Sequence, residues 1–131
     1  MGRPVVELLL DSTILIDRFN KIPEAKKYLA DTRGKAAISV VTRAEVLTGF
    51  DASLRAVAIR FLDYFPLLEI MKPIADLAAN LRREHNWKLP DAFQAALANH
   101  HGLRLVMRNT RDFSPQRHDF VVVPYTLGSE R

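Results

Sequence analysis

Short apolar runs alternate along the chain with longer stretches in which apolar residues recur every three or four positions. The short runs are five or six residues long and rich in Val, Ile and Leu. Runs of this length and composition are typical of buried β-strands. They predict strands at residues 5–10, 36–41, 65–70, 103–107 and 120–125.

The longer stretches have the spacing of amphipathic helices. Several begin at a proline, and the last ends at Gly102. Proline in the first turn and glycine just after the last turn are typical helix boundaries. This pattern predicts helices at residues 12–19, 23–32, 42–65, 73–86 and 90–102.

Strands that alternate with helices indicate an α/β fold with a mostly parallel sheet covered on both faces. The chain has 131 residues and shows no repeat, low-complexity tract or linker, so we expect a single domain over residues 1–131. It has no cysteine, which excludes thiol catalysis and zinc–thiolate sites and favours a reducing compartment. No apolar run is long enough to predict a membrane span.

The charge of the chain is moderately basic and evenly spread. Nineteen Lys and Arg against fifteen Asp and Glu give a net charge of +4, with no basic tail. A basic surface is compatible with a polyanionic partner such as nucleic acid, although many basic proteins bind none. Charge alone therefore does not assign a function.

Four acidic residues fall where ligands bind in α/β folds, near the junctions of strands and helices. Asp11 follows the first predicted strand, and Glu45 lies in the first turn after the second. Asp91 begins the last predicted helix, and Asp112 follows the fourth strand. Each also has a local interpretation: a helix cap for Asp11, a capping box with Thr42 for Glu45, helix-dipole stabilisation for Asp91 and a turn for Asp112.

Gathered at one sheet edge, four carboxylates would repel one another unless a cation lay between them. Oxygen ligands without His or Cys suit Mg²⁺ or Mn²⁺. Such ions activate water and neutralise charge on a phosphodiester. Outside this group, the chain has nineteen basic residues and only eleven acidic ones. An acidic metal pocket on a basic body is a distribution that suits a nucleic-acid hydrolase.

Four segments then occur in the order LLLDSTILID, ISVVTRAEVLTG, LPDAFQAALANHHGLRLVMRNTRDF and FVVVPY. In this order and at these spacings they resemble the PIN-domain family, and within it the VapC-like toxins of bacterial and archaeal toxin–antitoxin pairs. The resemblance covers nearly the whole chain.

The resemblance implies a Rossmann-like five-stranded sheet with an Mg²⁺ or Mn²⁺ pocket and endonucleolytic cleavage of RNA. It also implies a cytoplasmic homodimer neutralised by a small VapB-like antitoxin, part of which lies near the active site. The matching acidic positions are Asp11, Glu45 and Asp91, with either Asp112 or Asn109 completing the site. We favour Asp112, with Asn109 as a polar neighbour, and Thr13 as polar support for metal or water.

Two other functions are compatible with the sequence: a PIN-like nuclease of RNA maturation or DNA processing, and a non-catalytic binding module whose acids only cap helices. Asp17 is expected to be exposed or paired with an arginine rather than to bind metal. Trp87 is expected to pack in the core or in its loop, with base stacking or a dimer contact as the alternatives. The histidines are not expected to act as ligands; they are His85, His100, His101 and His118.

Overall fold

The computed structural model describes residues 5–108, 110–111 and 113–128. Five strands form one sheet in the order β3-β2-β1-β4-β5, and every pairing is parallel. The predicted α/β fold with a five-stranded parallel sheet is confirmed, although each strand is shorter than its apolar run. The strands are β1 (Leu8–Leu10), β2 (Ala36–Ser39), β3 (Leu67–Leu68), β4 (Arg104–Val106) and β5 (Val121–Val122).

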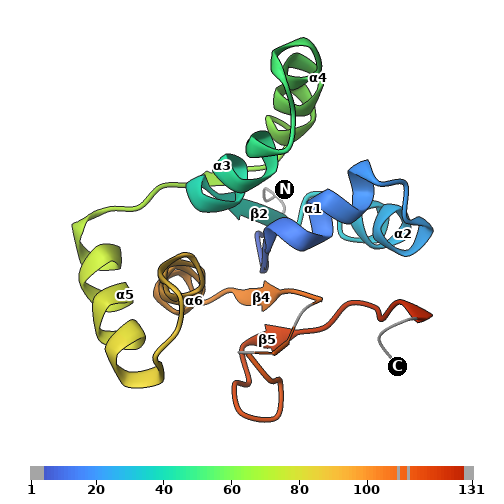
Figure 1. Cartoon of the computed structure of the whole chain (residues 1–131). Helices are drawn as coiled ribbons and strands as arrows, with labels where there is room; N and C mark the ends of the chain where they lie inside the picture. Colours follow the sequence, from blue (N-terminus) through green and yellow to red (C-terminus); the bar gives the residue numbers. More distant parts are fainter. Residues whose placement is uncertain (1–4, 109, 112, 129–131) are drawn as a thin grey trace.

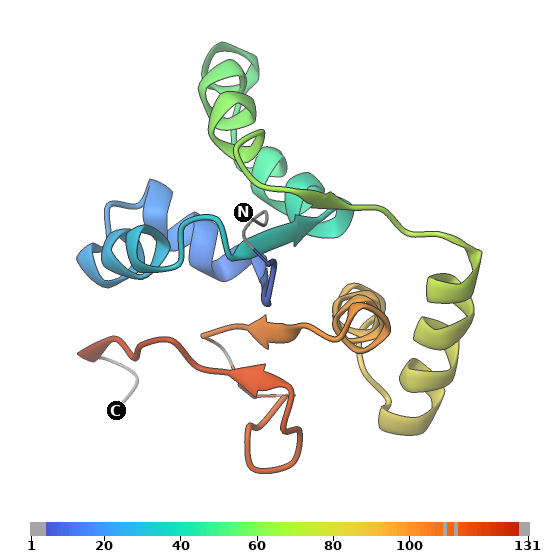
Figure 2. The same cartoon turned by 180° about the vertical axis from the view of Figure 1, so that it is seen from behind.

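Helices flank this sheet, with α5 and α6 on one side of the molecule and α1 and α2 on the other (Figure 1). The view from behind shows the same arrangement (Figure 2). Within the described part of the chain, every helix is too short or too polar to span a membrane. The helices are α1 (Ser12–Phe19), α2 (Pro23–Asp31), α3 (Val40–Thr48), α4 (Ala52–Leu62), α5 (Lys72–His85) and α6 (Leu89–His101).

The sheet separates two apolar clusters, because successive strand residues point to opposite faces. Leu9 and Leu105 belong to the cluster built with α5 and α6. Leu10 and Val106 belong to the cluster built with α1, α3 and α4. All four side chains are fully buried. Burial of both faces explains why the strand sequences are continuously apolar rather than alternating.

The second predicted strand ends earlier than its apolar run. Ser39 caps α3, because its side chain accepts a hydrogen bond of 3.0 Å from the backbone amide of Thr42. The helix therefore begins at Val40, and the predicted strand over 36–41 is two residues too long. The β-branched Val40 and Val41 favoured a strand, but the serine cap outweighs that preference.

The single helix predicted over residues 42–65 is divided into α3 and α4. Gly49 ends α3, and Asp51 caps α4 by accepting hydrogen bonds from the amides of Ser53 and Leu54. Figure 1 shows α4 projecting from the sheet beyond α3. The capping aspartate after a glycine is the sequence signal for this break.

The strand order also fixes where a ligand site can lie. β1 has β2 on one side and β4 on the other, so the chain winds in opposite directions from this point. In open α/β sheets, ligands bind beyond the carboxyl ends of the strands at such a reversal. The ends of β1 and β4 carry Asp11 and Met107.

Candidate active site

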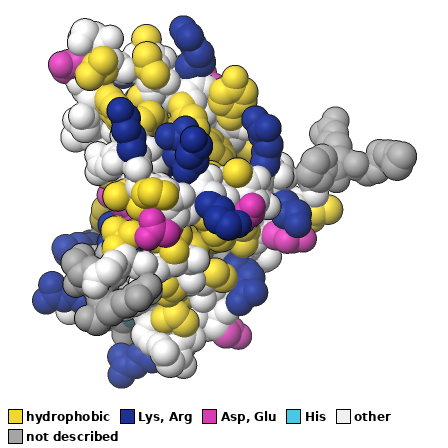
Figure 3. All heavy atoms as spheres, turned by 90° about the vertical axis from the view of Figure 1, so that its right-hand side faces the viewer, with side chains coloured by type: hydrophobic (Ala, Val, Ile, Leu, Met, Phe, Trp, Pro, Cys, Tyr) yellow, Lys and Arg dark blue, Asp and Glu magenta, His cyan; other side chains and the backbone are white. Residues whose placement is uncertain are grey.

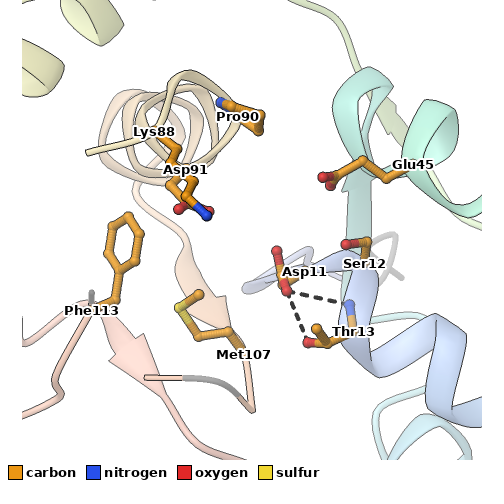
Figure 4. A pocket seen from close by; sticks show the side chains of 9 residues that line it. All are labelled: Asp11, Ser12, Thr13, Glu45, Lys88, Pro90, Asp91, Met107 and Phe113. Carbon is orange, nitrogen blue, oxygen red and sulfur yellow. Dashed lines mark hydrogen bonds between the residues drawn. The ribbon is translucent and has the colours of Figure 1, made fainter. Parts of the chain in front are cut away.

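A hollow of about 250 Å³ opens at the carboxyl ends of β1 and β4. Three carboxylates from three separate segments face it: Asp11 after β1, Glu45 on α3 and Asp91 on α6 (Figure 4). The remaining described lining residues are Ser12, Thr13, Lys88, Pro90, Met107 and Phe113.

Asp11 has both of the roles considered for it, because it caps α1 and faces the hollow. Its Oδ2 atom accepts a hydrogen bond of 3.3 Å from the amide of Thr13 and one of 2.8 Å from the Thr13 hydroxyl. In Figure 4 both bonds reach the same carboxylate oxygen. Thr13, predicted as polar support, therefore orients Asp11 within the hollow.

The capping-box interpretation of Glu45 is wrong, because the cap of α3 is Ser39 and Thr42 lies inside the helix. Glu45 points towards the hollow instead (Figure 4). Partial burial of its carboxyl raises the pKa of Glu45, a hydrogen bond with Ser12 lowers it, and the nearby charge of Asp11 raises it again. The net rise means that the hollow disfavours the charged carboxylate.

Asp91 lies in the first turn of α6, where the helix dipole favours a negative charge. This local interpretation therefore remains compatible with the structure, but Asp91 also faces the hollow. Lys88, at the N-cap of α6, lines the same hollow. The sequence analysis did not predict that Lys88 and Ser12 line the hollow. Both lie close in sequence to predicted site residues, since Ser12 follows Asp11 and Lys88 is three residues before Asp91.

The remaining two predicted site residues, Asn109 and Asp112, lie outside the described residues. The segment that contains them joins β4 to Phe113, which lines the hollow.

The chemistry of the three acids suits a hard divalent cation. Among the described residues, no three His, Asp or Glu side chains converge closely enough to form a complete metal site. Mg²⁺, however, is commonly held by one or two carboxylates together with waters and substrate phosphate. Burial first, and then the nearby charge of Asp11, raise the pKa of Glu45, and a bound cation would offset both effects. The donor set therefore fits Mg²⁺ or Mn²⁺.

We expect Glu45→Gln to stabilise the metal-free protein slightly at about pH 7. The folded protein holds the Glu45 proton more tightly than the unfolded chain, so this carboxyl costs stability as pH rises from its ordinary pKa of 4.5. Solvent screening keeps the expected gain below about 1 kcal/mol. Urea unfolding in EDTA at about pH 7 and about pH 4 measures it, and the gain should vanish at the lower pH.

The matched control is Glu69→Gln, which removes an exposed carboxyl between β3 and α5. It should leave the free energy of unfolding unchanged at both pH values. A Glu45→Gln protein less stable than wild type at neutral pH would contradict the electrostatic interpretation of the hollow.

A buried ion pair lies near this site. Asp17 is 4% exposed and accepts hydrogen bonds from the Arg108 guanidinium, 2.7 Å from Nε and 3.1 Å from Nη2. The hydroxyl of Tyr125 donates to the same carboxylate over 2.9 Å. Of the two alternatives predicted for Asp17, pairing with an arginine is confirmed and exposure is wrong. Because Arg108 follows Met107 directly, the pair anchors the chain where it leaves the hollow.

Arg108 also lines a second, open hollow of about 570 Å³ beside the first. The two hollows share Thr13 as a lining residue. Arg111 brings a second guanidinium to this surface, and because the Arg108 charge is paired with Asp17, the basic character of the described lining comes from Arg111. The other residues that line it are Thr110, Pro115, Gln116, Val123 and Thr126.

Trp87 packs between two aromatic rings, 4.1 Å from His85 and 4.3 Å from Phe113, and is only 7% exposed. The prediction of core or loop packing is confirmed, since Trp87 belongs to the apolar cluster built with α5 and α6. His118 lies at the edge of the Trp87 ring, and burial lowers its pKa. Phe113 connects this cluster to the hollow, whose described lining contains no histidine.

The PIN domain model matches residues 8–117, which contain the sheet from β1 to β4 and all three acids of the hollow. The chain belongs to the PIN-domain family. The resemblance proposed from the sequence is thereby confirmed, and the fold agrees with it. The match ends at residue 117, so the expectation of a single domain over residues 1–131 stays a prediction.

Solved structures similar to this PIN domain include chains of several toxin–antitoxin complexes. A chain of a toxin–antitoxin complex from Klebsiella pneumoniae is 38% identical, with a TM-score of 0.83; the match covers 92% of this PIN domain chain and 100% of the other. A chain of DNA-bound VapBC from Salmonella typhimurium is 23% identical, with a TM-score of 0.72. This match covers 83% of the present chain and 91% of the Salmonella chain. The second likeness shows the fold alone. No curated protein matches the chain significantly.

Proposed function

We propose that this PIN domain is a metal-dependent endoribonuclease and the toxin of a VapBC-type toxin–antitoxin pair. One observation carries the proposal: Asp11, Glu45 and Asp91, from three separate segments, line one hollow at the switch point of the sheet. Helix caps have no reason to meet at one place, and Glu45 caps no helix. A non-catalytic module therefore explains the arrangement less well.

When bound, Mg²⁺ or Mn²⁺ would supply an activated water and a counter-charge for the scissile phosphate. In this proposal Asp11 and Asp91 hold the ion, and the Thr13 hydroxyl fixes the orientation of Asp11. Glu45 completes the acidic group and, with its raised pKa, is suited to accept a proton at its carboxylate. We keep Asp112 as the proposed fourth acid, with Asn109 as its polar neighbour.

The basic hollow next to the acidic one supports a polyanionic substrate. Guanidinium groups bind phosphate through paired hydrogen bonds, and Arg111 lines the surface on which the strand would continue, beside Arg108, whose guanidinium is paired with Asp17. Lys and Arg side chains are also spread over the face shown in Figure 3. We propose RNA as this substrate, in agreement with the toxin assignment.

We expect Arg111→Ala to weaken RNA binding several-fold. The magnitude of the slope of log K against log salt concentration should fall by about one, which corresponds to the loss of one phosphate contact. Fluorescence anisotropy of a labelled single-stranded RNA at several salt concentrations measures both. Arg33→Ala is the control. This exposed arginine precedes β2, at the amino-terminal end of the strands, whereas the hollows lie at their carboxyl ends. Equal losses in the two variants would remove the basic hollow from the proposed substrate path.

The partners proposed are a VapB-like antitoxin and a second copy of the chain. The 38% identical structure is part of a toxin–antitoxin complex, which supports the antitoxin. Large apolar side chains are exposed on and just after α4, and a partner chain would cover them: Leu54, Val57 and Tyr64. A cytoplasmic site of action agrees with an RNA target.

The test is cleavage of mixed cellular RNA by antitoxin-free protein with Mg²⁺ or Mn²⁺, with EDTA and an Asp11→Asn protein as controls. Asparagine caps helices about as well as aspartate, so the variant should fold while losing the charge. Metal-dependent cuts that are absent from Asp11→Asn support the proposal. Cuts of equal rate in both proteins, or cuts that persist in EDTA, contradict it.

Expression without the antitoxin tests the toxin role separately from the chemistry. Growth arrest by wild type, relieved by Asp11→Asn, is expected for a toxin. A nuclease that cuts a single precursor RNA and leaves growth unchanged would point instead to RNA maturation.

A further inference from the structure

A buried glutamine interrupts the otherwise apolar inner surface of α6. Gln94 is 2% exposed and lies in the sequence AFQAALA, where the neighbouring alanines and Leu97 are also buried. A buried amide costs free energy unless each of its polar atoms has a partner. Its presence here therefore calls for an explanation in terms of its hydrogen bonds.

Both polar atoms of the Gln94 side chain are bonded to residues of the β2–α3 junction. The Ser39 hydroxyl donates to Gln94 Oε1 over 2.7 Å, and Gln94 Nε2 donates to the Thr42 hydroxyl over 2.7 Å. The Thr42 hydroxyl in turn donates to the carbonyl oxygen of Leu10 over 3.2 Å. Ser39 and Thr42 are fully buried, so water does not compete for these bonds.

The directions of these bonds are mutually consistent. Thr42 has one hydroxyl proton and donates it to Leu10, so it can only accept from the amide nitrogen of Gln94. The Ser39 hydroxyl accepts from the Thr42 amide and keeps its proton for Gln94 Oε1. A carboxylate at position 94 lacks the donor that this chain requires.

Three members of this hydrogen-bond network lie within three residues of an acid that lines the hollow. Leu10 immediately precedes Asp11. Thr42 and Glu45 are three residues apart on α3, as are Asp91 and Gln94 on α6. Residues three apart are neighbours on a helix surface, so each of these two acids lies next to a member of the network on its own helix.

We propose that Gln94 is a positioning residue, whose amide fixes the separation of the three chain segments that carry Asp11, Glu45 and Asp91. Gln94 is not among the described residues that line the hollow. It acts by tying α6 to the β2–α3 junction and, through Thr42, to the end of β1. The binding consequence of this role rests on the proposed metal-dependent function.

The experiment compares Mn²⁺ binding by calorimetry in wild type, four single variants and one double variant. Gln94→Met keeps the length of the side chain and removes its hydrogen bonds, and Thr42→Val removes the shared hydroxyl. Thr42→Ser restores that hydroxyl. Leu97→Ala, on the same helix but outside the network, is the control for lost core stability.

Gln94→Met and Thr42→Val should each raise the Mn²⁺ Kd about tenfold. Combined, they should raise it by less than the product of the single effects, because they break the same bond. Thr42→Ser should bind like wild type. Leu97→Ala should lower the Tm and leave the Kd within about twofold of wild type. A Gln94→Met Kd equal to that of wild type, or an equal loss in Leu97→Ala, overturns the proposal.

Native-state hydrogen exchange without metal provides an independent readout. The Thr42 amide donates to Ser39, and the Asp11 amide donates to Val106. Gln94→Met should speed exchange at both amides more than Leu97→Ala does. If Gln94→Met does not fold, Thr42→Val and Thr42→Ser are compared by the Mn²⁺ Kd and by amide exchange. Loss in Thr42→Val with wild-type values in Thr42→Ser supports the proposal, and equal values in the two variants overturn it. If wild type binds no Mn²⁺, the proposed metal site fails, and hydrogen exchange alone decides the role of Gln94.

Discussion

Asp91→Asn is expected to reduce RNA cleavage by at least about 100-fold while the fold is retained. Changes to groups that only support metal ligands already cost about 10- to 100-fold, so loss of a proposed ligand charge should cost more. Asparagine keeps the shape of the side chain in the first turn of α6. Initial cleavage rates with saturating Mn²⁺, together with Mn²⁺ affinity by calorimetry, measure the effect.

Asp76→Asn provides the matched control for this variant. Asp76 is an exposed acid on α5, outside the described lining of the hollow. The Asp76→Asn protein should cleave RNA at the wild-type rate and have the same urea unfolding curve as wild type. Cleavage by Asp91→Asn at the wild-type rate would remove Asp91 from the proposed chemistry. An equal loss in both variants would show that the assay reports a general effect of charge.

The parallel sheet could be predicted from the sequence because both of its faces are buried. Each strand is then a short continuous apolar run, which differs clearly from the helical spacing between the runs. The convergence of Asp11 and Glu45 could be predicted for a related reason. Both follow parallel strands, and the carboxyl ends of such strands meet at one edge of the sheet.

The boundaries were harder to predict where a local cap competes with an apolar run. Val40 and Val41 continue the apolar pattern of β2, but the Ser39 side chain accepts the Thr42 amide and starts a helix instead. The same cap overturns the pairing of Thr42 with Glu45, since Thr42 is inside the helix. The spacing of a capping box is therefore ambiguous when another capping residue lies three positions earlier.

The partners in the interactions between distant segments could not be predicted from the sequence, although an arginine was expected as one possible partner of Asp17. Gln94 is separated by 55 residues from Ser39, and Arg108 by 91 residues from Asp17. Their local sequence signals are weak, because a single glutamine in a helix or an arginine after a strand is usually solvated. Only the fold shows that these polar groups are buried and paired.

The ion pair of Asp17 and Arg108 makes the second large prediction, which concerns stability. The Asp17 side chain is 6% exposed and that of Arg108 is 21% exposed. Burial, the hydrogen bond to Asp17 and the charge of Asp17 raise the pKa of Tyr125 above its ordinary value of 10.0. Asp17 therefore satisfies two polar groups at once, at the point where the last segment of the chain meets α1.

We expect Asp17→Ala to lower the free energy of unfolding by about 3–5 kcal/mol, measured by urea denaturation at neutral pH. The alanine leaves the Arg108 charge and the Tyr125 hydroxyl without this carboxylate, and that uncompensated burial dominates the cost. Asp31→Ala is the control, because the Lys27–Asp31 pair is 77% and 59% exposed and should contribute less than about 1 kcal/mol. Equal effects of the two variants would show that the buried pair contributes no more than a surface one.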